Sequence, residues 1–191
     1  MALSPEIWTI GHSNHSQERF IELLVENEIE FLVDVRSFPY SRYADHFNRE
    51  ELESTLRKAG VRYVFMGEEL GGRPSDDSHF DADGHALYGL MAAQATFEQG
   101  ISRVLEGASQ GRLVIMCSCG QPDECHRRLL VGKVLTERGA KLQHILPSGE
   151  IKPENEVLIF SQTSLFGEAE NAWRSTQSVS HRQRLNTSSA A

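Results

Sequence analysis

The chain has 191 residues, of which 39% are hydrophobic, 24% charged and 8% aromatic, and its formal net charge is −8. This composition is that of a globular protein, and it excludes a largely disordered chain, a collagen-like repeat and a coiled coil. No apolar run approaches the roughly 18 residues that a membrane span needs, and the first residues lack the basic start and apolar stretch of a secretory signal.

The first half of the chain alternates short apolar runs with amphipathic helical patterns. The expected elements follow in the order strand 7–11, helix 17–27, strand 31–35, helix 49–59 and strand 61–66. Ser16 and Asn48 stand where the two helices need a capping side chain. Pro39 prevents the second strand from continuing. Strands and helices that alternate at this spacing favour a parallel sheet.

The second half begins with a long polar segment. Residues 67–85 are rich in glycine and aspartate and predict a long loop, which in a compact domain tends to be functional or mobile. The expected elements then follow in the order helix 86–94, helix 97–109, strand 113–117, helix 124–138 and strand 142–146. Thr96 is the expected cap of one helix, and Asp123 or Glu124 that of the last.

These elements predict one α/β domain over residues 1–160, a Rossmann-like or rhodanese-like three-layer domain. Its sheet is expected to have five strands, mostly parallel, with helices on both faces. Residues 161–191 are rich in serine, threonine, glutamine and asparagine, and predict a polar, loosely ordered tail. Ligands bind beyond the carboxyl ends of parallel strands, so the candidate site is sought in the loops that follow the strands.

The segment Cys117 to Arg128, CSCGQPDECHRR, has the highest density of potentially reactive and charged side chains, and it leads from a predicted strand into a predicted helix. The amide groups at a helix start favour an anion and stabilise a thiolate. We therefore expect Cys125 to be a catalytic thiol of low pKa, His126 to move a proton and Arg127 to bind substrate. The alternative is that the cysteines are small core residues and the arginines are solvated.

The same segment has the residue types of a zinc site, because Cys117, Cys119, Cys125 and His126 are all acceptable zinc ligands. Neighbouring residues on a helix, however, point about 100° apart, and a second Cys-x-x-Cys pair is missing. We expect no metal site and no cofactor. Three cysteines also cannot form a closed disulfide framework, which is typical of a reducing cytoplasm.

The loop after the second strand offers a carboxylate and an arginine. Asp34 is a candidate catalytic acceptor, and Arg36 a candidate clamp for substrate, with Tyr40 and Arg42 completing the binding site. The alternative for Asp34 and Arg36 is an ion pair that only stabilises the strand end.

Two shorter segments add candidates to the same edge of the sheet. His12 is a candidate proton carrier and Ser13 a candidate hydroxyl donor after the first strand. Gly71 and Gly72 would allow the backbone to approach a ligand closely, although two glycines also suit any turn.

At these residues the sequence resembles the bacterial and archaeal proteins catalogued as domain of unknown function 488. The segments that carry the resemblance are Thr9–Ser13, Asp34–Arg42, Gly67–Gly72 and Cys117–Leu130. The resemblance implies an α/β domain whose polar residues cluster, with no assigned reaction. Cys119 stands where the family pattern has a glutamate. A more distant similarity to rhodanese-like sulfurtransferases rests on FLVDVR, residues 31–36, and VIMCSCG, residues 114–120.

The charge distribution narrows the choice of ligand. Residues 161–191 hold three arginines and two glutamates, which leaves a net charge of −9 on residues 1–160. So acidic a body is a poor non-specific binder of polyanions. Fifteen of the 19 basic residues are arginine, which forms bidentate contacts with phosphate or carboxylate. A small anionic ligand or a nucleotide is the expected partner, and nucleic acid stays open as a partner. We expect no membrane association and have no expectation about oligomeric state.

Three hypotheses about function follow. The first is an enzyme that acts on a phosphate-bearing small molecule, a nucleotide or a nucleic-acid base, with Arg36 and Arg127 on the phosphate and His12 or His126 as proton carrier. The second is a rhodanese-like sulfurtransferase that uses Cys117 or Cys119. The third is a non-enzymatic anion-sensing module built on the same residues.

Overall fold

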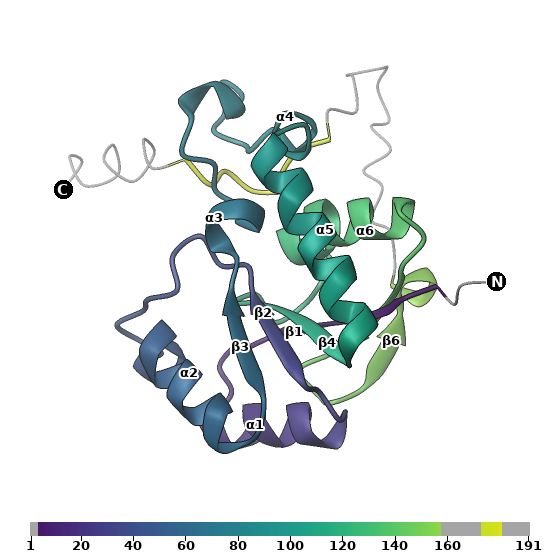
Figure 1. The fold of residues 1–191 in the computed structure, drawn as a ribbon. Coiled ribbons are helices and arrows are strands. Elements are labelled where there is room, and N and C mark those ends of the chain that lie inside the picture. Colours follow the sequence, from purple (N-terminus) through teal and green to yellow (C-terminus); the bar gives the residue numbers. More distant parts are fainter. Residues whose placement is uncertain (1–3, 158–172, 181–191) are drawn as a thin grey trace.

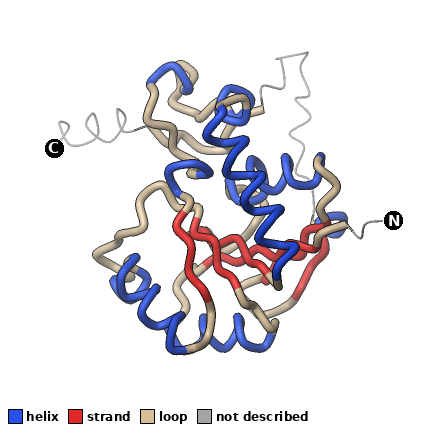
Figure 2. Tube along the Cα trace, viewed as in Figure 1, coloured by secondary structure: helices blue, strands red, loops and turns tan. Residues whose placement is uncertain are grey.

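A computed structural model describes residues 4–157 and 173–180, and a six-stranded sheet runs through its centre in the order β3-β2-β4-β1-β5-β6 (Figures 1 and 2). The strands are β1 (Glu6–Gly11), β2 (Phe31–Asp34), β3 (Arg62–Phe65), β4 (Leu113–Cys117), β5 (Lys141–Ile145) and β6 (Ile151–Pro153). All neighbouring strands are parallel except β5 and β6, which are antiparallel. The α/β class with a mostly parallel sheet is confirmed.

The predicted count of five strands was one too low. Strand β6 has three residues, too few to show an alternation in the sequence, and it ends in Pro153. Proline is tolerated at the edge of a sheet, where its missing N–H group breaks no ladder. The strand pairs with β5 at this edge, with Ile145 opposite Ile151.

Helices cover both faces of the sheet, as predicted. One face packs against α1 (Gln17–Glu26) and α2 (Arg49–Lys58), whose buried residues include Phe20, Leu24 and Leu56. The other face is covered by α3 (Gly67–Leu70), α4 (Tyr88–Ala92), α5 (Ala95–Gln110), the π-helical segment η3 (Arg127–Gly132) and α6 (Lys133–Glu137). In Figure 1, α5 crosses the near side of the sheet and α1 and α2 lie below it. Three single 3-10 turns are η1 (Asp45–Phe47), η2 (Asp77–His79) and η4 (Glu154–Glu156).

The local structure differs from the sequence prediction at several helices. The loop predicted over residues 67–85 contains α3 and η2. Helix α5 begins one residue before Thr96, and its N-cap is Gln94. The helix predicted over residues 124–138 is a π-helical segment followed by a short α-helix, and it begins later, at His126. The cause lies in the turn before it, where the Cys125 N–H donates to the Pro122 carbonyl at 3.1 Å.

Part of the segment predicted as a loose tail packs on the body. Trp173 donates its indole N–H to the Leu129 carbonyl at 2.7 Å. Ser175 is buried and exchanges hydrogen bonds with the backbone of Ala86, at 2.9 Å in each direction. The segment 173–180 is therefore held by a large apolar anchor and by backbone hydrogen bonds. The remainder of the predicted tail, residues 161–172 and 181–191, lies outside the described residues.

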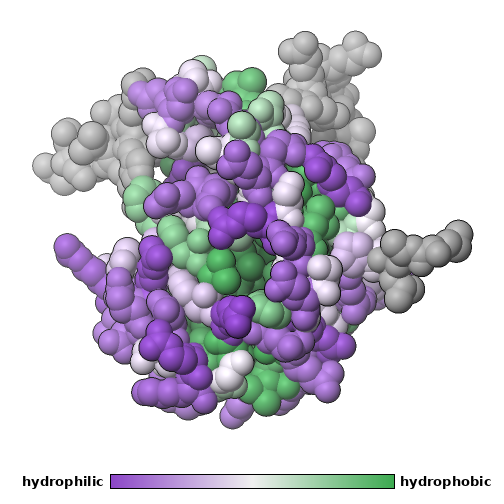
Figure 3. Space-filling view, in the orientation of Figure 1, coloured by the Kyte–Doolittle hydropathy of each residue, from purple (hydrophilic) through white to green (hydrophobic). Residues whose placement is uncertain are grey.

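None of the helices in residues 4–157 and 173–180 is long and apolar enough to cross a membrane. The face seen in Figure 3 is largely hydrophilic, with apolar side chains gathered in small areas near its centre and lower end.

A buried polar network joins η4 to the sheet and to η3. Arg128 donates its Nε to both carboxylate oxygens of Glu154, at 2.9 and 3.1 Å. His144, which is fully buried, donates Nε2 to Glu154 at 2.8 Å, and its Nδ1 lies 2.7 Å from the Thr9 hydroxyl. Burial opposes ionisation of Glu154, but His144 and Arg128 prevail and lower the pKa of its carboxyl group.

We predict that Glu154→Gln lowers the free energy of unfolding by about 2–4 kcal/mol at neutral pH, because it leaves Arg128 buried with no anionic partner. The folded pKa lies below the unfolded value of 4.5. The contribution of Glu154 is therefore complete above that value and is lost as the pH falls through the folded pKa. Urea denaturation at several pH values measures this difference. The exposed Glu156 in the same turn supplies the control, Glu156→Gln, and equal losses in the two variants would contradict the prediction.

Candidate functional site

The carboxyl ends of β1, β2, β3 and β4 lie along one edge of the sheet, as the sequence predicts. Gly11 pairs with Cys117 across β1 and β4. The Val35 N–H donates to the Met116 carbonyl at 3.0 Å, and the Met66 N–H to the Asp34 carbonyl at 2.9 Å. The loops that follow these strands therefore share one edge, and the candidate residues they carry are placed by the parallel order of the strands.

Three potential ligand or nucleophile atoms converge at this edge. The Sγ atoms of Cys117 and Cys125 and a ring nitrogen of His126 all lie within 4.8 Å of one another. The Cys117 Sγ is 3.6 Å from His126 Nδ1. We call these three residues the Cys-His cluster. Both of its cysteines are buried, whereas Cys119, two residues after Cys117, is exposed.

The thiols of the site differ in their tendency to ionise. Hydrogen bonds from Cys119 and Cys125, together with the nearby His126, hold the pKa of Cys117 well below its usual range. The interaction with Cys117 raises the pKa of Cys119. Burial, and then Cys117, raise the pKa of Cys125 to about 12. The thiol whose pKa is lowered is therefore Cys117, whereas the sequence led us to expect a low pKa for Cys125, which is buried beside it.

His126 is held in one orientation by its surroundings. Its Nε2 donates to the Val35 carbonyl at 2.9 Å, and since a carbonyl only accepts, Nε2 carries a proton. Burial favours the neutral ring, but Cys117 outweighs it and raises the pKa of His126. Gly72 lies against the ring: a Cβ atom there would be 2.5 Å from the His126 Cγ. The imidazole is thus held between Val35, directly after β2, and the loop after α3, with Nδ1 facing the Cys117 sulfur.

The two glycines predicted to approach a ligand approach protein atoms instead. Gly72 makes room for His126, as described above. A Cβ on Gly71 would lie 2.3 Å from the Gly67 carbonyl oxygen and 2.4 Å from the Ser37 Oγ. Both positions require glycine for packing, and neither needs a ligand to explain it.

Arg127 binds the protein backbone. The residue is fully buried, and its Nη1 donates to the Cys119 carbonyl. Its Nη2 donates to the Gly120 carbonyl at 2.9 Å. The guanidinium therefore fixes the loop that carries Cys119 through its two Nη atoms.

Asp34 and Arg36 form a buried ion pair. Arg36 donates Nε and Nη2 to the carboxylate at 2.7 to 3.1 Å, and Nη2 also donates to the Phe47 carbonyl at 2.9 Å. Tyr63 donates its hydroxyl to the same carboxylate at 2.7 Å. Asp34 is thus fully engaged in structure. None of the hydrogen bonds among residues 4–157 and 173–180 uses Nη1 of Arg36, so this atom remains the one available to a ligand.

The other predicted residues are divided between this edge and the surface. His12 is buried, stacks on Phe47 with ring centroids 4.4 Å apart, and has its pKa lowered to about 4 by burial and by Arg36. Ser13, in the left-handed region with φ 50°, lies beside it and donates to Asn14. Tyr40 is exposed and donates to Glu50 at 2.8 Å, and Arg42 is exposed as well. Neither Tyr40 nor Arg42 joins the Cys-His cluster.

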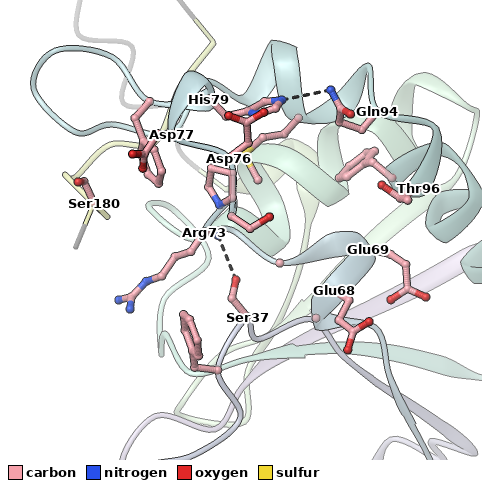
Figure 4. Close-up of a pocket in the computed structure, with 18 residues that line it drawn as sticks. Ser37, Glu68, Glu69, Arg73, Asp76, Asp77, His79, Gln94, Thr96 and Ser180 are labelled. Carbon is pink, nitrogen blue, oxygen red and sulfur yellow. Dashed lines mark hydrogen bonds and ion pairs between the residues drawn. The ribbon is translucent and has the colours of Figure 1, made fainter. Parts of the chain in front are cut away.

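A cavity of about 530 Å³ lies between the loop after α3 and the start of α5 (Figure 4). Gly71 is the one predicted site residue that lines it. The cavity has Arg73 at its wall, whose N–H donates to Ser37 at 3.0 Å, but its acidic lining outnumbers this cation. The acidic lining residues are Glu68, Glu69, Asp76 and Asp77. A lining with this excess of carboxylates does not suit an anion. In the sequence, the polar segment 67–85 was the feature that pointed to this part of the molecule.

Comparison with known proteins gives one family. A family model described as "Domain of unknown function DUF488" matches residues 16–134. The matched region includes Asp34, Arg36, Gly72 and the whole segment from Cys117 to Arg128. None of the curated proteins compared with the chain matches it.

Proposed function

The chain belongs to the DUF488 family, whose function is unknown, and we propose that it is a sulfur-transferring enzyme in which Cys119 carries the sulfur. The observation that supports this most is the exposed Cys119 thiol above a buried group of sulfur and imidazole side chains at the carboxyl edge of the sheet. Cys117 and Cys125 are buried, so Cys119 is the cysteine that a dissolved substrate reaches first.

The surroundings of Cys119 suit a carrier loop. Arg127 donates to the carbonyl groups of Cys119 and Gly120, which holds the loop in place without using the thiol. A Cβ on Gly11 would lie 1.7 Å from the Cys119 carbonyl oxygen, so the loop packs directly on the end of β1. A reactive group on a loop that is fixed by the fold is positioned before substrate arrives.

The substrate class follows from Arg36. Its Nη1 atom makes no hydrogen bond with the described residues, and Arg36 lies near Cys117 and His12. A small anionic donor of sulfane sulfur, such as thiosulfate, would place its oxygens on this guanidinium. The Cys119 thiol gives its proton to the neighbouring Cys117 thiolate as its sulfur attacks the outer sulfur of the donor. The S–S bond of the donor breaks, sulfite leaves, and Cys119 becomes a persulfide. The thiolate of an acceptor then attacks the outer sulfur and carries it away, which restores Cys119.

The test is sulfur transfer from thiosulfate to a small thiol, together with the mass of the protein after incubation with thiosulfate alone. We predict the addition of one sulfur atom to wild type, and a loss of at least about a thousandfold in the transfer rate for Cys119→Ser. Ser118→Ala, a change at the neighbouring exposed residue, is the control and keeps the rate.

The outcomes separate the alternatives. If Cys119→Ser keeps the rate and Cys117→Ser loses it, the carrier is Cys117 and the assignment to Cys119 fails. If wild type gains no sulfur from thiosulfate or from another sulfane donor, sulfur transfer itself is contradicted.

A second candidate is an enzyme that acts on a phosphate-bearing small molecule or nucleotide. The same Nη1 atom of Arg36 favours it, since phosphate is a common arginine ligand. The sequence suggested that Arg36 and Arg127 bind the phosphate together. That support is lost, because Arg127 donates to the backbone carbonyls of its own loop. Calorimetric titration with phosphate and nucleoside monophosphates tests this candidate. Binding without turnover would favour an anion-sensing module instead.

A further inference from the structure

We infer that the Cys-His cluster of Cys117, Cys125 and His126 is a binding site for a zinc-class metal ion, with its fourth coordination position on the side of Cys119. This assignment concerns the buried side chains beneath the proposed carrier and does not require that Cys119 transfers sulfur. It also replaces the sequence expectation of no metal site.

The distances within the cluster match those of a tetrahedral site. Zinc lies about 2.3 Å from a thiolate and about 2.0–2.1 Å from an imidazole nitrogen, so two such ligands of one tetrahedron are separated by about 3.6 Å. The Cys117 Sγ and His126 Nδ1 are 3.6 Å apart. All three donor atoms lie within 4.8 Å of one another, so a small inward movement of Cys125 completes three corners.

The orientation of His126 is that of a metal ligand. Metal-binding histidines usually donate their second ring N–H to a carbonyl or carboxylate, which fixes the ring and its tautomer. Here Nε2 donates to the Val35 carbonyl at 2.9 Å, so Nδ1 is the nitrogen that faces Cys117. Gly72 closes the space behind the ring. The imidazole is therefore held for coordination by groups that are not themselves ligands.

The sequence argument against a metal site assumed that Cys125 and His126 both lie on a helix, and the observed helix begins after Cys125. Neighbouring residues diverge by about 100° only if both lie on a regular helix. Cys125 precedes the helix, in the turn where its N–H donates to Pro122, and His126 is the first helical residue, directly before the π-helical segment η3. Their side chains are thus free to converge on Cys117.

The chemistry of the ligands selects the ion. Two thiolates and one imidazole suit zinc and related soft or borderline ions, whereas magnesium and calcium require oxygen ligands. Two thiolates also balance the two positive charges of the ion, so the loaded cluster is neutral in its largely buried position. Ser118 and Cys119, which directly follow Cys117 in the chain, are exposed, and an ion would enter beside them.

The first test uses the reduced full chain and Co²⁺ as a spectroscopic substitute for zinc. We expect one Co²⁺ per chain, thiolate-to-cobalt charge-transfer absorption, the visible bands of tetrahedral coordination, and displacement of Co²⁺ by one equivalent of Zn²⁺. Octahedral spectra, or no binding, would overturn the assignment and leave Cys117 and Cys125 as core residues.

The ligand set is tested by variants. Cys125→Ser and His126→Ala are each expected to weaken Co²⁺ binding at least about a hundredfold, and Cys119→Ser is expected to retain both affinity and charge-transfer absorption. Circular dichroism of each metal-free variant shows whether it folds; if Cys125→Ser does not, His126→Ala decides. Loss of binding in Cys119→Ser would overturn the three-ligand site. Sulfur transfer is measured separately, so either proposal can fail alone.

Discussion

Replacing Asp34 with alanine is expected to lower the free energy of unfolding by about 3–5 kcal/mol, because it leaves a buried arginine charge without its partner. Asp34 is fully buried and accepts hydrogen bonds from the Arg36 backbone, the Arg36 guanidinium and the Tyr63 hydroxyl. The Arg36 side chain is only 6% exposed, so little water reaches it to replace the carboxylate. Urea denaturation of wild type and variant measures the difference.

Two further variants show whether the loss comes from the unpaired charge. The double variant Asp34→Ala/Arg36→Met is expected to be more stable than Asp34→Ala alone, because it removes the charge together with its partner. Tyr63→Phe removes one hydrogen bond to the carboxylate and is expected to cost about 1 kcal/mol. If Asp34→Ala unfolds with wild-type stability, the pair is not structural, and Arg36 would be available as a complete clamp for an anion.

The strands of the sheet were predictable because strands that are buried on both faces consist of consecutive apolar residues. The runs around Ile7, Val33 and Ile115 are apolar on consecutive positions, as strands covered by helices must be. Strand β6 left no such mark, because it has three residues and lies at an edge. The π-helical segment η3 was also missed, since its apolar spacing is close to that of an α-helix over one or two turns.

The position of the candidate site was predictable, but the role of each residue was not. Parallel strands bring their carboxyl ends to one edge, so the loops with His12, Arg36 and Cys117 had to be neighbours. Whether an arginine faces a ligand depends on which carbonyl groups lie within its reach. The Cys119 and Gly120 carbonyls that Arg127 binds are local in sequence, yet only the folded loop turns them toward it.

The convergence of the Cys-His cluster depends on whether the helix begins before Cys125 or directly after it. A helix over 124–138 would have separated the side chains of Cys125 and His126, whereas a start at His126 lets them meet at Cys117. Sequence patterns place helix ends only to within a few residues. A cysteine next to a histidine was therefore visible in the sequence, and the geometry that would make them ligands of one ion was not.

Gly72→Ala is expected to weaken Co²⁺ binding by at least about tenfold while changing none of the proposed ligands. The new Cβ would lie 2.5 Å from His126 Cγ and 2.8 Å from its Nδ1. The ring cannot turn away without losing the hydrogen bond from Nε2 to the Val35 carbonyl. A shift of the ring that relieves the clash therefore changes the 3.6 Å separation between Nδ1 and the Cys117 Sγ.

The matched control is Gly89→Ala in α4, where the nearest atom to a new Cβ is a Trp173 ring carbon 4.0 Å away. This variant is expected to bind Co²⁺ as wild type does, and to gain slightly in stability because alanine favours a helix. Circular dichroism establishes that both variants fold, and Co²⁺ titration then compares their affinities. Wild-type affinity in a folded Gly72→Ala would mean that the ring position is not set by Gly72. Wild-type affinity and wild-type visible bands in His126→Ala as well would remove His126 from the ligand set, because the two results together leave the imidazole no part in holding the ion.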